Sequence, residues 1–247
     1  MNNEDKLKSI ITVLIVVVVL FAYYIGYFSS KLGFNALFIG GSATGIAANP
    51  SAPKAGEEPE FKQVEEVAFL ELKGDEYAKG NNSSNIVLVE FSDFECPFCA
   101  KFHPFVDNAV TKNNLKLVTK HFPLSFHKSA KDYAVMFECL GKNFGANQAF
   151  TFANKLFGVN SEKGGRVTLE DGLNEAKKLG LSDAQFNSCK ADTSITSKIE
   201  NNADEGMKLG INGTPALYIM NTSTKKAVRI NGLVDDSVLQ SEIDKLK

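Results

Sequence analysis

The 247-residue sequence contains no tryptophan, only three histidines and only four cysteines, and its formal net charge is −2. No stretch carries the concentration of Lys and Arg that binds a nucleic-acid backbone, so we expect neither DNA nor RNA as a partner. No segment recurs at a fixed spacing, which argues against a repeat protein. With 44% hydrophobic residues, the chain is long enough to bury one substantial core.

Residues that ligate metal ions are also sparse. A structural zinc site needs four ligands, and the single close pair, Cys96 and Cys99, has no second pair of cysteines or histidines at a recognisable spacing. Cys139 and Cys189 stand alone in the sequence. We therefore expect no metal, and we interpret Cys96 and Cys99 as a redox pair.

One long uncharged run occupies residues 10–28, which are mostly Val, Ile, Leu and aromatic residues. As a helix rising about 1.5 Å per residue, this run is nearly long enough to cross the hydrocarbon core of a bilayer, which is about 30 Å thick. The alternative is a cleaved signal peptide, whose apolar region is usually shorter. Lys6 and Lys8 precede the run and only Lys31 follows it closely, which favours a cytoplasmic N-terminus.

The first 60 residues are therefore predicted to precede the folded domain. Residues 1–9 are expected to be cytoplasmic, residues 10–28 to form a transmembrane signal anchor, and residues 29–60 to form a flexible tether rich in Gly, Ala, Ser, Asn and Pro. The catalytic domain would then lie on the extracytoplasmic side of a cell membrane, either periplasmic or external. Disulfides persist in such compartments, which suits a chain with an even number of cysteines.

The remaining residues predict an α/β domain. Apolar and β-branched residues indicate strands at 67–72, 86–91 and 115–122, with a polar loop at 79–85 and a helix from the cysteine pair to Lys112. Near the C-terminus, a hairpin is expected at 216–220 and 227–230. A last helix, capped by Asp236 or Ser237, follows the hairpin.

Residues 125–210 carry only helical signals. The expected helices run from Ser129 to a stop at Gly141, from Asn147 to a stop at Gly158, from Thr168 to Gly180, from Ser182 to Cys189, and from Ser194 to Gly210. Ser182 and Gln185 have the spacing of a capping box. We therefore divide the folded part into an α/β region at 61–124, an all-helical insertion at 125–210, and a second α/β region at 211–247.

An apolar strand leads directly to the cysteine pair. Pro97 follows Cys96 and suits the first turn of a helix, where its missing N–H costs nothing. Cys96 is therefore expected at a helix N-terminus, where unpaired N–H groups and the helix dipole favour a thiolate, the form that attacks disulfides. A purely structural bond between Cys96 and Cys99 is the alternative, although so short a loop removes little chain entropy.

Glu90 is an acidic residue inside this apolar strand, six residues before Cys96. Burying a carboxylate is costly and makes it a stronger base. We therefore predict that Glu90 accepts a proton near the inner cysteine, Cys99, as that thiol becomes a thiolate. The alternative is a glutamate at the edge of the strand, in contact with solvent.

Three motifs together resemble the DsbA-type branch of the thioredoxin superfamily, the thiol–disulfide oxidoreductases of bacterial cell envelopes. They are Val89–Cys99, Phe122-Pro-Leu124 with His127, and Gly213-Thr-Pro-Ala216. Cys139 and the apolar helix pattern at 149–157 extend the resemblance, which covers about residues 75–247. It implies a thioredoxin-like fold, with a central mixed β-sheet flanked by helices and an all-helical insertion, which the transmembrane helix would precede.

The resemblance also assigns roles to residues around Cys96. The Thr214–Pro215 bond, which general frequencies predict to be trans, would be cis and would lie against the Cys96 sulfur. Backbone next to Thr214 and Pro215 would pair with an extended substrate, and Pro97 and Phe98 would contact it. Glu90 would match the buried acid of the family.

Cys139 and Cys189 fall where some relatives carry a second disulfide inside the helical insertion. Closing a loop of about 50 residues, such a bond would contribute up to about 4 kcal/mol on the chain-entropy model. Two buried free thiols are the alternative, because cysteine is among the most buried residue types.

The sequence departs from the resemblance at two aromatic positions. The most oxidising members carry a histidine at the place of Phe98, which cannot donate a hydrogen bond. We therefore expect a pKa for Cys96 between the reference values of about 3.5 in DsbA and about 7 in thioredoxin. Phe94 stands where relatives often carry a larger aromatic residue. Together with Phe98 and the aromatic residues near Phe102, it is expected to offer unfolded substrates an apolar surface.

The function predicted on this basis is a membrane-anchored thiol–disulfide oxidoreductase that introduces disulfides into exported proteins, with no cofactor besides the Cys96–Cys99 disulfide. A mixed disulfide would form on Cys96, and a quinone-linked membrane protein would reoxidise the pair. One alternative is an isomerase or reductase that uses the same site. The other is a chaperone-like binding module in which the thiols are incidental.

Overall fold

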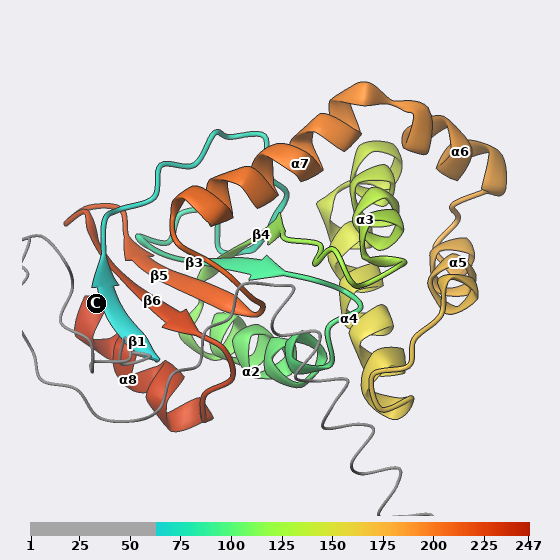
Figure 1. Cartoon of the computed structure of the whole chain (residues 1–247). Coiled ribbons are helices and arrows are strands. Elements are labelled where there is room, and N and C mark those ends of the chain that lie inside the picture. The colour runs from blue at the N-terminus through green and yellow to red at the C-terminus, as the bar shows by residue number, and fades with distance from the viewer. Residues whose placement is uncertain (1–62) are drawn as a thin grey trace, which may run out of the picture. The chain divides into compact units, whose positions relative to one another are not determined.

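The computed structural model describes residues 63–247, and a mixed β-sheet lies at its centre (Figure 1). The sheet has six strands in the order β1-β6-β5-β3-β4-β2. Their bounds are β1 Val64–Val67, β2 Ala78–Gly80, β3 Ile86–Ser92, β4 Lys116–His121, β5 Ala216–Asn221 and β6 Lys226–Asn231. β3 runs parallel to β4, and the other neighbouring strands are antiparallel. The predicted α/β fold with a mixed sheet is confirmed.

The predicted cytoplasmic segment 1–9, anchor 10–28 and tether 29–60 lie outside the described residues. Between residues 63 and 247, no helix combines the length and the apolar character that a membrane crossing requires.

Helices cover both faces of the sheet (Figure 1). α2 (Pro97–Asn113) and α8 (Asp236–Leu246) pack on the face that presents Leu88, Leu117 and Leu217. The opposite face, which presents Val89, Phe91 and Val118, is covered by the C-terminal part of α7 (Thr193–Lys208). All seven residues of β3 are buried, because the strand is central and has both faces covered.

The remaining helices form a group beside the sheet. They are α3 (Ala130–Phe144), α4 (Ala146–Glu162), α5 (Leu169–Lys178) and α6 (Asp183–Ala191). Capping boxes start α5 at Thr168 and α6 at Ser182. The second was predicted from the spacing of Ser182 and Gln185, whereas at Thr168 only the start of a helix was predicted. Gly180 and Gly210 follow helix ends with positive φ, which glycine adopts without steric cost.

Two glycines do not end helices as predicted. Gly141 lies inside α3, which continues to Phe144 and ends at Gly145 with φ +88°. A side chain at Gly141 would overlap the Tyr77 ring, so glycine is needed there for close packing and not for a turn. Gly158 lies inside α4, which continues to Glu162. A Cβ at this position would have no atom within 4 Å, so neither a turn nor close packing requires a glycine there.

Two predictions for the first strands are wrong. β1 ends at Val67, whereas a strand was expected at 67–72, because Leu70 and its neighbours pack as irregular chain against the face under α7. The short strand β2 falls in the expected polar loop, since Ala78 and Lys79 pair with the edge of β4. The last helix starts one residue earlier than predicted, with Asp235 at its N-cap.

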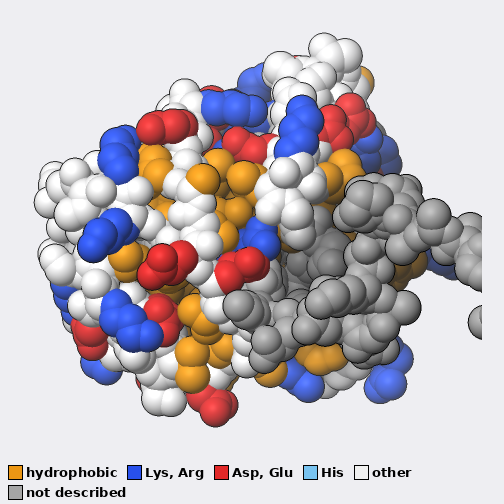
Figure 2. Space-filling model, turned by 60° about the vertical axis from the view of Figure 1, so that its left-hand side comes forward, with side chains coloured by type: hydrophobic (Ala, Val, Ile, Leu, Met, Phe, Trp, Pro, Cys, Tyr) orange, Lys and Arg blue, Asp and Glu red, His pale blue; other side chains and the backbone are white. Residues whose placement is uncertain are grey.

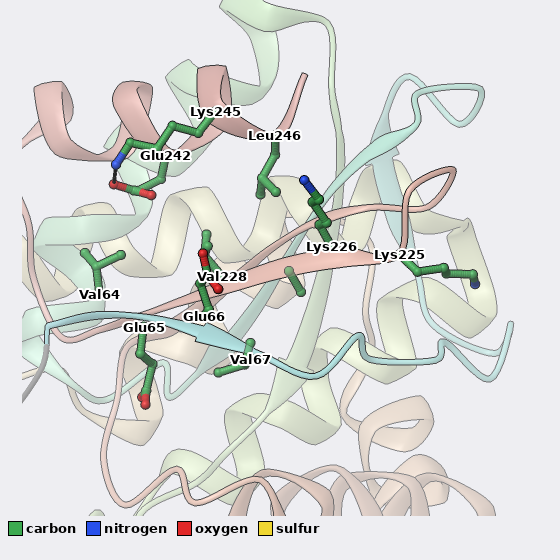
Figure 3. Close-up of a pocket in the computed structure, with 11 residues that line it drawn as sticks. Val64, Glu65, Glu66, Val67, Lys225, Lys226, Val228, Glu242, Lys245 and Leu246 are labelled. Carbon is green, nitrogen blue, oxygen red and sulfur yellow. Dashed lines mark hydrogen bonds and ion pairs between the residues drawn. The ribbon is translucent and has the colours of Figure 1, made fainter.

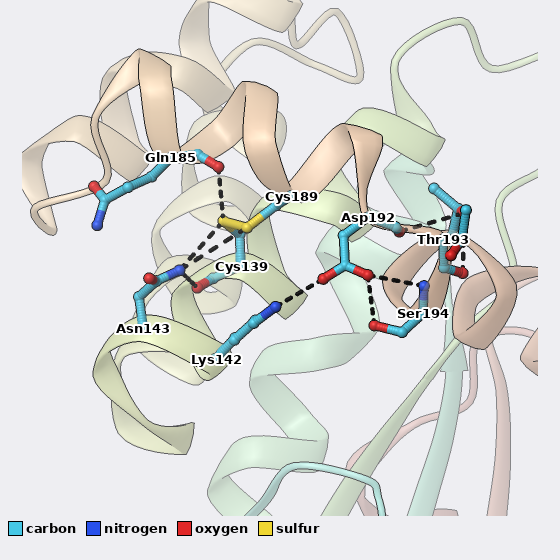
Figure 4. A network of polar contacts seen from close by, with 9 residues as sticks. Cys139, Lys142, Asn143, Gln185, Cys189, Asp192, Thr193 and Ser194 are labelled. Atoms are coloured by element: carbon cyan, nitrogen blue, oxygen red, sulfur yellow. Dashed lines mark hydrogen bonds and ion pairs between the residues drawn. A yellow bond between two sulfur atoms is a disulfide. The ribbon is translucent and has the colours of Figure 1, made fainter.

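A disulfide joins Cys139 on α3 to Cys189 on α6 (Figure 4). The two cysteines are separated by 50 positions in the sequence, and their Cα atoms lie 5.8 Å apart. Asn143, one turn after Cys139, donates a hydrogen bond to the Cys139 carbonyl at 2.8 Å. The bond therefore connects two helices of the group that lies beside the sheet.

Candidate active site

The redox pair lies where the central strand leads into α2. Cys96 is the N-cap residue of α2, and Pro97 is in the first turn. Both Cys96 and Cys99 are buried, and both are free thiols. The sequence produces this arrangement locally, because the apolar strand must end before the proline, and the proline favours the start of a helix.

The acidity of Cys96 is set by donors around its sulfur. A hydrogen bond from the Cys99 thiol lowers the pKa most strongly, against the effect of burial. The nearby polar Thr214 and the backbone N–H groups of Cys99 and Phe98 lower it further. Together they lower the pKa of Cys96 to about 6. This value lies within the range expected from the sequence, and at neutral pH it makes the thiolate the main form of Cys96.

Cys99 has the opposite tendency. Burial raises the pKa of Cys99 well above its usual range, and the neighbouring Cys96 raises it further. Interactions with the polar side chains of Ser92 and Thr214 lower this pKa only in part. The two thiols therefore differ in acidity, with Cys96 as the nucleophile or point of attack and Cys99 as a thiol that has to lose its proton before it reacts.

The Thr214–Pro215 peptide bond is cis and lies beside the pair. The Cys96 thiol is 3.5 Å from the Thr214 carbonyl oxygen, to which it donates. Strand pairing explains this position, because Ala216 at the start of β5 is opposite Phe91 near the end of β3. Residues 118 positions apart in the chain thus meet at one sulfur atom.

Glu90 is fully buried, so its alternative interpretation as a solvent-exposed strand-edge residue is wrong. Its Oε1 accepts a hydrogen bond from Ser92 Oγ at 3.2 Å, and its Oε2 is 2.8 Å from His103 Nδ1. The Ser92 side chain also acts on the Cys99 thiol and lowers its pKa. Ser92 therefore stands between Glu90 and Cys99.

Two site residues, His103 and Asp93, were not predicted from the sequence. His103 lies four residues after Cys99, and this spacing puts both side chains on the same face of α2. The buried Asp93 accepts hydrogen bonds from the backbone N–H groups of Glu95 and Leu124 and pairs with His127, each within 2.8 Å. Asp93 thereby joins the turn before Cys96 to the loop after β4.

The predicted apolar surface is only partly correct. Phe94 is 1% exposed and packs against the rings of Phe137, Phe152 and Phe157, and Phe102 is also buried in the core. Their rings fill space under the helical group and cannot contact a substrate. The exposed large apolar side chains on α2 are Phe98, at 56%, and Phe105, at 39%.

One hollow of the described region lies apart from the cysteine site. A hollow of about 720 Å³ is lined by β1, β6 and α8, including Glu242 and Lys245, and none of its lining residues belongs to the cysteine site (Figure 3). On the face shown in Figure 2, basic and acidic side chains are interspersed. Within residues 63–247, no group of three or more His, Cys, Asp or Glu side chains is placed to hold a metal ion.

Known structures share this architecture. The chain aligns with the DsbA2 structure of Pseudomonas aeruginosa at 27% identity and a TM-score of 0.59, covering 72% of this chain and 97% of that one. It aligns with alpha-DsbA1 of Wolbachia pipientis at 21% identity and a TM-score of 0.57, covering 70% and 91%. With BcfH of Salmonella enterica Typhimurium the identity is 23%, the TM-score is 0.61, and the coverage is 70% and 74%. The last two alignments concern the fold alone.

Sequence comparison identifies both partial relatives and the family. The Na(+)/H(+) antiporter NhaA 1 of Salinispora arenicola is 26% identical over 145 residues, which are 58% of this chain and 21% of the antiporter. The chain thus spans about a fifth of the length of the curated relatives it matches. Residues 73–235 match the thioredoxin family over most of the described region. The chain belongs to the thioredoxin family and has the fold of the DsbA-like thiol–disulfide oxidoreductases.

Proposed function

We propose that this protein is a thiol–disulfide oxidoreductase that introduces disulfides into exported proteins. The observation that carries the proposal is the difference in acidity between the two thiols, with the pKa of Cys96 lowered to about 6 and the pKa of Cys99 raised. A stabilised Cys96 thiolate favours the reduced enzyme. The oxidised enzyme therefore tends to take electrons from substrates, as an oxidase must.

The reaction runs in two exchange steps. A substrate thiolate attacks the Cys96 sulfur, the Cys96–Cys99 bond breaks, and Cys99 leaves with the electron pair and takes up a proton. A second substrate thiolate then attacks the substrate sulfur of the mixed disulfide and releases the Cys96 thiolate. Two substrate thiols are oxidised to one disulfide and the enzyme disulfide is reduced to two thiols, so no cofactor besides the Cys96–Cys99 pair takes part.

Residues around the pair have distinct roles in this proposal. Glu90 exchanges the proton of Cys99 through Ser92, which donates a hydrogen bond to Glu90 and lowers the pKa of Cys99. Backbone at Thr214 and Pro215 pairs with an extended substrate segment, since the cis bond holds it beside the Cys96 sulfur. Pro97 and the exposed Phe98 contact the substrate beside its cysteine.

The sequence supports a cellular setting for this proposal. Residues 10–28 would anchor the protein in the cell membrane, with the tether at 29–60 holding the catalytic domain on the extracytoplasmic side. A quinone-linked membrane protein would reoxidise the reduced pair, and anchoring would raise its effective concentration.

The reduction potential tests the proposal. The full-length protein in detergent is equilibrated with mixtures of reduced and oxidised glutathione, its thiols are trapped, and the oxidised fraction is read from the mass. A potential near the DsbA reference of about −120 mV supports the oxidase. A potential near the thioredoxin reference of about −270 mV contradicts it and favours a reductase or isomerase. No exchange at all would leave only a binding module.

A further inference from the structure

The buried His103 has a defined proton arrangement. Its Nε2 lies 2.8 Å from Asn154 Oδ1, and Asn154 Nδ2 donates to Asp107 Oδ2 at 3.3 Å, which fixes the orientation of the amide. Because an amide oxygen only accepts, Nε2 carries a hydrogen and donates it. The other ring nitrogen, Nδ1, faces Glu90 Oε2 at 2.8 Å. Two lone pairs at that distance repel, so a proton lies between His103 and Glu90.

Charges from three elements act on His103. Burial alone would lower its pKa, but the charge and hydrogen bond of Glu90 on β3 raise it above its ordinary value, with Asn154 on α4 and Asp107 on α2 contributing. Lys79 pairs with Asp107 and reduces its influence. The Phe157 ring, 4.8 Å from the imidazole ring centre, closes the remaining side. This environment favours the imidazolium.

The second oxygen of Glu90 leads to the reacting sulfur. Ser92 Oγ donates to Glu90 Oε1 at 3.2 Å, and the Ser92 side chain also acts on the Cys99 thiol, whose pKa it lowers. Ser92 therefore stands between Cys99 and a hydrogen-bonded path that continues through Glu90 to His103. Both Glu90 and Cys99 are fully buried, so the proton of Cys99 has to pass to a protein group and not directly to solvent.

We propose that His103 is a positioning residue for the step in which Cys99 becomes a thiolate. Its imidazolium holds Glu90 beside Ser92 and offsets the negative charge that forms on the Cys99 sulfur. Ser92 relays the proton of Cys99 to Glu90, and Asn154 keeps the imidazole in the required tautomer. This inference rests on the proposed exchange chemistry, whichever its direction in the cell.

The step balances when Cys99 resolves a mixed disulfide. The Cys99 S–H bond breaks and its proton passes to the Ser92 oxygen, while the Ser92 hydroxyl proton passes to Glu90 Oε1. The freed electron pair of the Cys99 sulfur forms the bond to Cys96, and the bond between Cys96 and the substrate breaks. The substrate leaves as a thiolate with that electron pair, so one negative charge has moved from Glu90 to the substrate.

The path ends at solvent on α4. Asn154 is exposed and lines a hollow of about 670 Å³ between α4 and α5. None of the residues that line this hollow is one that we place against the substrate, namely Pro97, Phe98, Thr214 or Pro215. The solvent-facing end of this network therefore lies on α4, away from the residues that we place against the substrate.

The test measures resolution of the mixed disulfide in His103→Asn. The Asn amide can still donate to Glu90 but carries no charge. Full-length reduced protein in detergent is mixed with a large excess of oxidised glutathione, quenched in acid at intervals, and analysed by mass. We expect conversion of the Cys96–glutathione disulfide into the Cys96–Cys99 disulfide to slow about tenfold at neutral pH, equal to one unit on the pKa of Cys99. Alkylation of Cys96 by iodoacetamide should stay within about twofold, since this reaction does not require Cys99 to lose its proton.

His121→Asn is the matched control. His121 is also a buried histidine bonded to a buried glutamate, with its Nε2 2.9 Å from Glu138 Oε1. Equal slowing in both variants would mean that the loss of any buried histidine–glutamate pair slows resolution, and it would overturn the proposal. An unchanged resolution rate in His103→Asn would also overturn it. If wild-type protein forms no mixed disulfide on Cys96, the proposed function itself fails, and this inference with it.

Discussion

The two cysteine pairs of this chain differ in their surroundings, although all four residues are buried. Cys96 and Cys99 lie within one turn of α2, at a helix N-terminus and beside a cis peptide bond. Cys139 and Cys189 lie 50 residues apart and join α3 to α6 (Figure 4). Accessible area therefore does not distinguish a redox pair from a structural one in this protein.

What differs is the effect of breaking each bond. Reduction of the first pair leaves two thiols on one helical turn, and the donors around Cys96 stabilise its thiolate. Reduction of the Cys139–Cys189 bond opens a long loop, and the unfolded chain then gains conformational entropy. The comparison indicates that one pair is suited to exchange and the other to holding helices together.

The largest expected effect is on catalysis. Cys96→Ser should abolish exchange with glutathione, because the Cys96 sulfur is the atom that is attacked, while the double variant Cys139→Ala with Cys189→Ala should retain exchange. Mass analysis of mixed disulfides measures both. Exchange that persists in Cys96→Ser would contradict the assignment of the Cys96 sulfur as the atom that is attacked.

The next effect concerns stability. The same double variant should lose up to about 4 kcal/mol of unfolding free energy, because a closed loop of about 50 residues is released. Urea unfolding of the full-length protein in detergent measures the loss. Cys96→Ala with Cys99→Ala serves as the control, since its bond closes only a short loop. A loss as large in this control would contradict the structural role assigned to Cys139–Cys189.

The two cysteine pairs should also differ in how the reduced protein responds to pH. The folded pKa of Cys96, about 6, lies below that of an unfolded thiol. Its thiolate therefore stabilises the reduced protein above the unfolded pKa, and this stabilisation is lost as the pH falls through about 6. Ultraviolet thiolate absorbance of the reduced protein should show a transition near that pH. The transition should be absent in Cys96→Ser and unaltered when Cys139 and Cys189 are replaced.

The smallest expected effect concerns Phe98, which lies between the two cysteines of the redox pair. Phe98→His adds a donor next to the Cys96 sulfur and should lower its pKa by on the order of one unit. Phe105→His places a histidine on the same helix, also exposed but farther along it, and should leave the pKa unchanged. The same absorbance titration compares the two variants. Equal shifts in both would attribute the effect to general charge on α2.

Much of the fold could be predicted because its signals are local. The capping boxes at Thr168 and Ser182 satisfy helix ends with residues three positions away, and the apolar run at 86–91 can only be buried as a central strand. Gly141 shows where this approach fails. A glycine at a helix end and a glycine under an aromatic ring are identical in sequence, and only the position of Tyr77 distinguishes them.

The candidate site divides in the same way. The sequence by itself determined that Cys96 begins a helix after a buried strand and that residues 73–235 belong to the thioredoxin family, because both depend on residue types at short fixed spacings. Only the tertiary structure decided that Glu90 is bound to His103, that Phe94 is core, and that Thr214 meets the Cys96 sulfur. Each of these depends on packing between segments distant in the chain, where burial removes water and makes the contacts determine acidity.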